Sequence, residues 1–196
     1  MIQRALSLVA LGALGACTLG AAAPKEHFYR LPASSAHDVC DGAALEGAIW
    51  IDRFDSSPLH GERAIIHAHD DGLTLTQHNY QFWVDSPRSL LTASLGDFLR
   101  ETKCFSGVSD DQTGADYQAR GRIIQFERRK RGKTYEAVVA IDIVIRSSQR
   151  GDNLVAARYR AVKQVSDDSL SAFVAEMGYA LDEVYSRLVQ DLSERN

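Results

Sequence analysis

The stretch AVVAIDIVIRS, residues 137–147, places an aliphatic side chain at every second position from Ala137 to Ile145. A repeat of two residues is typical of a β-strand that has one buried face. The segments 117–123 and 155–161 alternate in the same way, with arginines on their second face. Together they predict three consecutive strands, the first two joined as a hairpin, in a mainly antiparallel sheet.

Further strand signals lie on the N-terminal side of this block. Residues 45–54 are predicted to form one strand. Residues 64–69 and 73–78 are predicted to form two more, because Asp71-Gly72 between them is a strong signal for a hairpin turn.

Two helices are predicted alongside the strands. The first begins at Ser86-Pro87, where a capping residue precedes a proline at the first helical position. The second follows Ser169 and repeats apolar residues at spacings of four and three, a seam that core packing explains without a coiled coil. We therefore expect an α/β fold, a mainly antiparallel β-sheet covered on one face by two α-helices. The apolar positions are Leu91, Leu95, Phe98 and Leu99 in the first helix, and Leu170, Val174, Met177, Leu181, Val184 and Leu188 in the second.

The N-terminus has the composition of an export signal. Arg4 is followed by a short apolar run, and Leu14-Gly15-Ala16-Cys17 matches the pattern of the bacterial lipobox. The run is too short to cross a bilayer, which takes roughly 20 apolar residues. We expect cleavage before Cys17 and lipidation of that cysteine, with an ordinary secreted protein as the alternative.

The predicted processing divides the chain into three parts. Residues 1–16 are a lipoprotein signal peptide, 17–27 a lipidated N-terminus and tether, and 28–196 one periplasmic domain. Thr18 stands where an aspartate would retain a lipoprotein in the inner membrane. The sequence thus predicts a lipoprotein anchored in the outer membrane and facing the periplasm.

Charge and cysteine content narrow the possible partners. Removal of residues 1–16 leaves 21 Lys and Arg against 26 Asp and Glu, a net charge of about −5, so nucleic acid is not expected as a partner. Cys40 and Cys104 would lie in an oxidising compartment, where a pair of cysteines favours a disulfide. Two unpaired buried thiols are the alternative, since the sequence does not place the two residues side by side.

Two short motifs carry a family resemblance. HFYRLP, residues 27–32, follows the lipobox closely, and YQFWVDSP, residues 80–87, joins an aromatic strand to a proline-started helix. With the charged strands and the long C-terminal helix, this order of elements resembles the ABC-type transport auxiliary lipoproteins. The resemblance implies a non-enzymatic partner of an MCE-type lipid transport system, such as the paraquat-inducible Pqi system. It also implies a homo-oligomer, because members of the family can form rings.

Five residues are candidates for partner contacts. Arg128, Arg129 and Arg131 belong to a basic run, residues 127–133, that lies between two predicted strands and is expected at an exposed hairpin tip. Tyr80 and Trp83 match the family motif and are first expected to pack internally, then to serve at an interface. A solvated turn is the alternative for the basic run, and anionic lipid headgroups are another possible contact.

Evidence for chemistry in the sequence is weak. Histidines 67, 69 and 78 would share one face of the predicted hairpin, within reach of a common zinc ion, but Thr74 and Thr76 give that face the character of a solvated surface. No nucleophile elbow, phosphate-binding loop or zinc protease motif occurs in the mature chain. We therefore expect neither an enzyme nor a cofactor.

The sequence leaves three functions open. The leading hypothesis is an outer-membrane lipoprotein of an ABC/MCE-type lipid transport system that docks the periplasmic conduit, an MCE-domain protein, to its membrane. The alternatives are an envelope-assembly lipoprotein without a transporter and a metal-binding periplasmic lipoprotein that uses His67, His69 and His78.

Overall fold

The computed structural model describes residues 24–34, 40 and 45–194, which form nine strands and three helices. Cys17 and the predicted signal peptide lie outside these residues. The elements, in chain order, are β1 (His27–Tyr29), β2 (Leu45–Ile51), β3 (Asp55–Ser56), α1 (Pro58–Gly61), β4 (Ala64–Ala68), β5 (Leu75–Trp83), α2 (Pro87–Thr102), β6 (Phe105–Ser109), β7 (Tyr117–Arg131), β8 (Thr134–Ser147), β9 (Asn153–Val165) and α3 (Leu170–Ser193).

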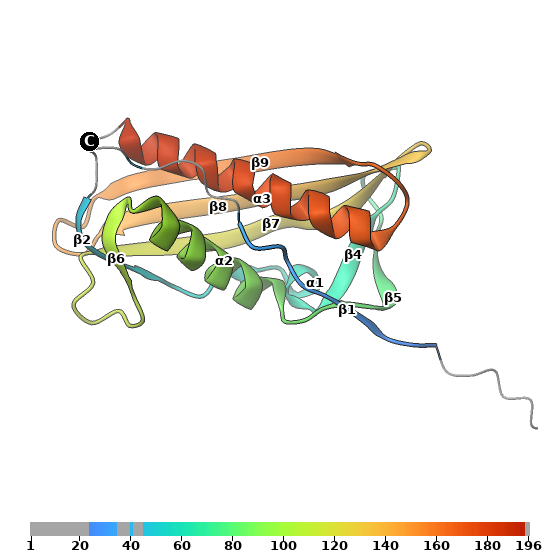
Figure 1. The fold of residues 1–196 in the computed structure, drawn as a ribbon, viewed down its shortest axis with the longest axis horizontal. Coiled ribbons are helices and arrows are strands. Elements are labelled where there is room, and N and C mark those ends of the chain that lie inside the picture. Colours follow the sequence, from blue (N-terminus) through green and yellow to red (C-terminus); the bar gives the residue numbers. More distant parts are fainter. Residues whose placement is uncertain (1–23, 35–39, 41–44, 195–196) are drawn as a thin grey trace, which may run out of the picture.

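The strands form one curled, mixed sheet in an α/β fold (Figure 1). The long strand β7 pairs with β2, β3 and β4 in parallel and with β8 in an antiparallel ladder. Of the eight strand pairings among the described residues, five are parallel. The expectation of a mainly antiparallel sheet is therefore wrong, because alternation along a strand indicates its buried face and not its neighbour or direction.

The strands predicted from the opening stretch are confirmed as an antiparallel meander of β7, β8 and β9. Ile123 pairs with Ile141, and Ile141 with Tyr159, so one row of core residues crosses all three strands. The β4–β5 hairpin has the predicted register, with His67 opposite Thr76 and the amide of His69 bonded to the carbonyl of Thr74. A bulge between Ile123 and Gln125 shifts the alternation of β7 by one residue.

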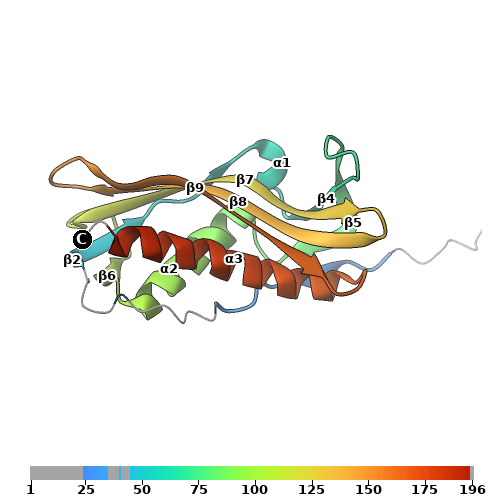
Figure 2. The ribbon, with the colours of Figure 1, turned by 90° about the horizontal axis from the view of Figure 1, so that it is seen from above.

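The two long helices lie on the same side of the sheet, as predicted (Figure 2). Ser86 caps α2 by accepting from the amide of Ser89, and Pro87 is its first residue. Ser169 caps α3 in the same way through the amide of Ala172. The four-residue helix α1 was not expected; it begins at Pro58 after the capping residue Ser57.

The core fills the space between the sheet and these two helices. Its largest fully buried side chains include Trp83, Tyr185, Phe98 and Phe173. Cys40 and Cys104 lie at its edge, where a disulfide joins them with their Cα atoms 5.0 Å apart. The bridge ties the segment before β2 to the end of α2.

Candidate functional site

The basic run predicted at a hairpin tip lies mostly within β7, and only Gly132 and Lys133 connect β7 to β8. Arg128 is 5% exposed; its guanidinium lies 3.6 Å from the ring centroid of Tyr135 and donates to the carbonyl of Asp168. The expected exposure of Arg128 is wrong because the bulge in β7 turns this residue toward the helices.

Arg129 and Arg131 both lie near the carboxylate of Glu136, but they differ in distance and in exposure. Arg129 faces outward and pairs with Glu136 at 2.6 Å, with its side chain 16% exposed. The side chain of Arg131 is 58% exposed and lies 3.6 Å from the same carboxylate. Of the three arginines, only Arg131 therefore keeps the exposure that a contact at the tip requires.

The two aromatic candidates differ in exposure: Trp83 is buried and Tyr80 is exposed. Trp83 is 1% exposed, and its ring lies 5.1 Å from that of Phe126 and 6.1 Å from that of Phe173. It packs internally, as first expected, and presents no exposed surface to a partner. Tyr80 is 43% exposed and has a φ of 60°, a left-handed conformation that is rare for a residue with a side chain. Tyr80 remains a candidate contact.

The three histidines meet, as predicted. All three are half-buried, although Thr74 and Thr76 on the same face are exposed. The ring of His67 lies 5.1 Å from that of His69 and 5.6 Å from that of His78. Arg128 is opposite His67 on β7, and Tyr135 lies 5.9 Å from the His67 ring. The cluster thus continues the helix-facing side of the sheet beyond the start of α3.

The electrostatics of this cluster disfavour positive charge. Burial, followed by the charges of His78, His69 and Arg128, lowers the pKa of His67 from 6.5 to about 4. Burial, with Arg128, also lowers the pKa of His78. Throughout the described part of the chain, no group of three or more His, Cys, Asp or Glu side chains is placed to hold a metal ion. A divalent cation would also lie next to Arg128, so the metal-binding hypothesis loses support.

A series of polar contacts at α1, not predicted from the sequence, joins Ser57, His60 and Glu127. Ser57 Oγ lies 2.9 Å from Nδ1 of His60, and Nε2 of His60 lies 3.4 Å from a carboxylate oxygen of the buried Glu127. Ser57 also accepts from the amide of His60 as the cap of α1, and Glu127 accepts from Gln125. These contacts satisfy buried polar groups and cap a helix. Ser57-Pro58 was the signal that could have predicted this helix start.

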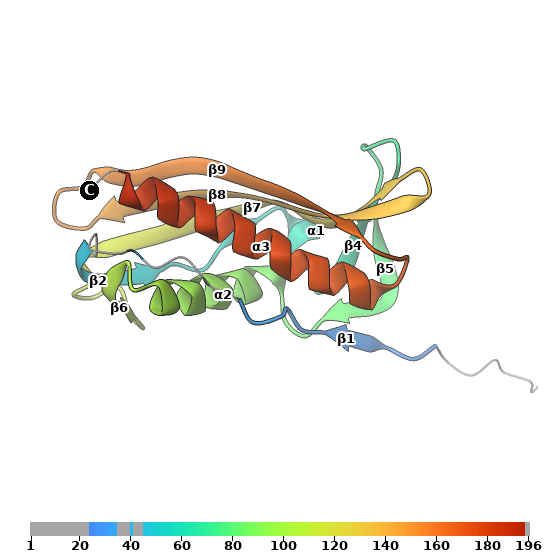
Figure 3. The same ribbon diagram turned by 45° about the horizontal axis from the view of Figure 1, so that its top comes forward.

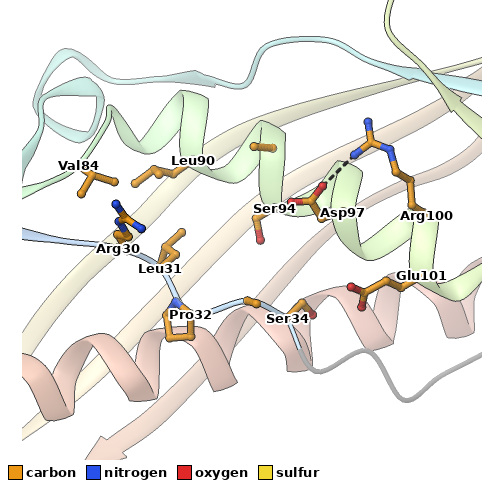
Figure 4. A pocket seen from close by; sticks show the side chains of 12 residues that line it. Arg30, Leu31, Pro32, Ser34, Val84, Leu90, Ser94, Asp97, Arg100 and Glu101 are labelled. Carbon is orange, nitrogen blue, oxygen red and sulfur yellow. Dashed lines mark hydrogen bonds and ion pairs between the residues drawn. The ribbon is translucent and has the colours of Figure 1, made fainter.

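A surface groove of about 510 Å³ lies between the segment after β1 and α2 (Figure 4). Leu31, Val84 and Leu90 line one part of it, and Asp97 and Arg100, which form an ion pair at 2.8 Å, line another. An apolar wall beside a charged rim is the usual composition of a contact surface.

Comparison with known families identifies the chain. A family model described as the ABC-type transport auxiliary lipoprotein component matches residues 29–189. The chain belongs to this family. It is thus an auxiliary lipoprotein component of an ABC-type transport system, which implies a transporter as its partner and suggests a non-catalytic role. No curated protein sequence matches the chain.

Solved structures share the fold of this auxiliary lipoprotein. Protein XCC0632 from Xanthomonas campestris, of the DUF330 family, has a TM-score of 0.75 at 13% identity, with 86% of this chain and 96% of that one covered. The hypothetical protein CT253 from Chlamydia trachomatis has a TM-score of 0.52 at 7% identity, with 77% and 98% covered. At these identities the likeness shows the fold alone. Among the described helices, none is both long and apolar enough to span a membrane.

Proposed function

We propose that this auxiliary lipoprotein serves an ABC/MCE-type lipid transport system and holds the periplasmic conduit, an MCE-domain protein, against the outer membrane. The match of the transport auxiliary family over residues 29–189 carries the proposal. The lipobox at Leu14–Cys17 supports an anchor, and the motifs at residues 27–32 and 80–87 support the narrower resemblance to the MCE-linked members.

A role by contact fits the side chains of the domain. The candidate groups with altered electrostatics, His67 and His78, are held neutral beside Arg128, and Ser57 and His60 cap a helix. General acid–base catalysis needs a group that can gain or lose a proton next to a bound substrate. A homo-oligomer is part of the proposal and rests on the family resemblance.

The decisive experiment is capture of the transporter from cells. The tagged full chain, crosslinked in living cells and purified from membranes, should bring down a permease, an ATPase and an MCE-domain protein. Recovery of the permease and ATPase without an MCE protein would leave an ABC auxiliary role but contradict the lipid-transport proposal. Recovery of envelope-assembly proteins alone would support the second hypothesis instead.

The anchor needs its own measurement. Mass spectrometry of the mature N-terminus should find an acylated Cys17, since several buried acyl chains, each methylene contributing about 0.8 kcal/mol, give stable anchoring. Cys17→Ala should release the protein from the membrane. A Cys17→Ala protein that still fractionates as an integral component would contradict lipidation.

A further inference from the structure

The outer face of the β7–β9 meander carries a group of arginines. Before the bulge, even-numbered residues of β7 point away from α2 and α3, and the same holds for even-numbered residues of β8 and β9. One row across the sheet alternates in charge and is paired in register: Asp55, Arg122, Asp142 and Arg158. We call the following set the arginine face: Arg120, Arg122, Arg146, Arg158 and Arg160, all exposed.

The arginine face has a positive excess in an acidic chain. Asp142 binds Arg158 through both carboxylate oxygens, at 2.5 and 2.8 Å, and Asp52 lies 3.6 Å from Arg120. Asp55, an exposed residue of β3, is paired in register with Arg122. Three acids therefore stand against the five arginines and leave two arginine charges uncompensated. Arg122 and Arg160 form no ion pair within the described part of the chain. The whole sequence, by contrast, has 26 acidic and 22 basic residues.

The shape of this face leaves room for a partner. Val144 and Ala156 sit between the arginines and help to line an open depression of about 510 Å³. The long helices cover the other side of the sheet, as Figures 2 and 3 show. This depression, lined by small side chains and by Arg158, can therefore be approached directly.

We propose that the arginine face binds a carboxylate-rich surface on a periplasmic protein subunit of the transporter. This inference rests on the proposed function, in which the domain acts by contact. Every cation on the face is arginine, whose planar guanidinium pairs with carboxylates through two hydrogen bonds and is enriched at protein interfaces, whereas lysine is depleted there.

Position favours a protein over the membrane as the occupant. Arg120 and Arg146 lie near the β8–β9 turn, whereas β1, where the described chain begins, lies toward the opposite end of the molecule (Figure 3). An anchor attached ahead of β1 would hold that opposite end nearest the bilayer. Arg120 and Arg146 would then lie at the end of the face farther from the bilayer.

The test uses the full, tagged chain with a photo-crosslinking residue at Ala156, in the middle of the face. A second crosslinking position at Tyr179, 59% exposed on α3, samples the opposite side. The face variant is Arg122→Glu with Arg160→Glu. Its matched control is Lys25→Glu with Lys103→Glu, which makes the same change in charge at exposed positions elsewhere. Thermal midpoints of purified variants check that both fold.

The expected result is a crosslink from position 156 to a periplasmic transporter subunit, through a peptide that contains Asp or Glu. Reversal of two arginines should reduce this crosslink at least about tenfold, because like charges then face each other. The lysine control should retain it within about twofold. Raised salt should weaken it in the parent.

Four outcomes would overturn the inference. Crosslinks from position 156 to phospholipid instead of protein would make the face a membrane surface. If the face variant and the lysine control lose the crosslink equally, the loss reflects the overall charge of the protein and not the arginine face. Capture of transporter subunits from position 179 but not from 156 would overturn the arginine face while the proposed function stands; capture from neither position, nor by general crosslinking, would overturn both.

Discussion

Acid should destabilise this protein through His67, which folds into a cluster that disfavours its charge. Burial and the neighbouring His78, His69 and Arg128 lower its pKa from 6.5 to about 4. Above pH 6.5 the residue is neutral in both the folded and unfolded states. Between pH 6.5 and about 4 only the unfolded chain binds the proton, so the free energy of unfolding falls as the pH falls. Below about pH 4 both states are protonated and the loss levels off.

The size of the effect follows from the two pKa values. A fall from 6.5 to about 4 corresponds to about 3 kcal/mol if it is fully expressed. His67 is only half-buried, so solvent screening reduces the expected loss to about 1 to 2 kcal/mol. The pKa of His78 is lowered in the same cluster by burial and by Arg128, so the loss measured on acidification belongs to His67 and His78 together.

Urea unfolding between pH 7.5 and 4, with the disulfide intact, measures this loss. His67→Gln should flatten the decline in stability between pH 6.5 and 4, and the variant should approach or exceed the parent at pH 4.5. His27→Gln, which removes an exposed histidine at the start of β1, is the matched control. If His67→Gln and the parent lose stability in parallel over this range, the cluster does not disfavour the charged imidazole and the reasoning is refuted.

Three further substitutions test the core. Trp83→Ala should lower the free energy of unfolding by about 3 to 5 kcal/mol, because the side chain is 1% exposed; a loss below 1 kcal/mol in urea unfolding would contradict its placement. Gly121→Ala should destabilise the protein by about 1 to 3 kcal/mol, since a Cβ there would lie 2.3 Å from Cζ of Phe54; an unchanged thermal midpoint would show that the ring can move freely. Cys40 and Cys104 should resist thiol labelling in denatured, unreduced protein, and removing their bridge, which spans a sequence separation of 64, should cost about 4 kcal/mol; two labelled thiols would rule out the disulfide.

Several elements could be predicted because their signals are local. The alternation in residues 137–147 marks β8, Asp71-Gly72 lies in the turn between β4 and β5, and Ser86-Pro87 begins α2. The short strands β1, β3 and β6 and the single turn of α1 were not predicted, because two to five residues carry too little periodicity.

The candidate site was predicted less well. The histidine cluster was found from hairpin register, and the pair Cys40–Cys104 from compartment and parity. Arg128 was expected to be exposed, yet it is buried, whereas Trp83 packs internally as first expected. The arginine face was not recognised as a site, although its alternation was visible in the sequence.

The sequence by itself determined the strand faces, the helix starts, the lipobox and the family resemblance, all of which depend on residues close together in the chain. Tertiary structure alone decided which strands lie beside β7 and in which direction, since β2 and β4 reach it only after long excursions of the chain. It also decided the exposure of Arg128, because one bulge reverses the alternation of every later residue in β7. Pairing between distant segments depends on packing of the whole core, and no local pattern contains that information.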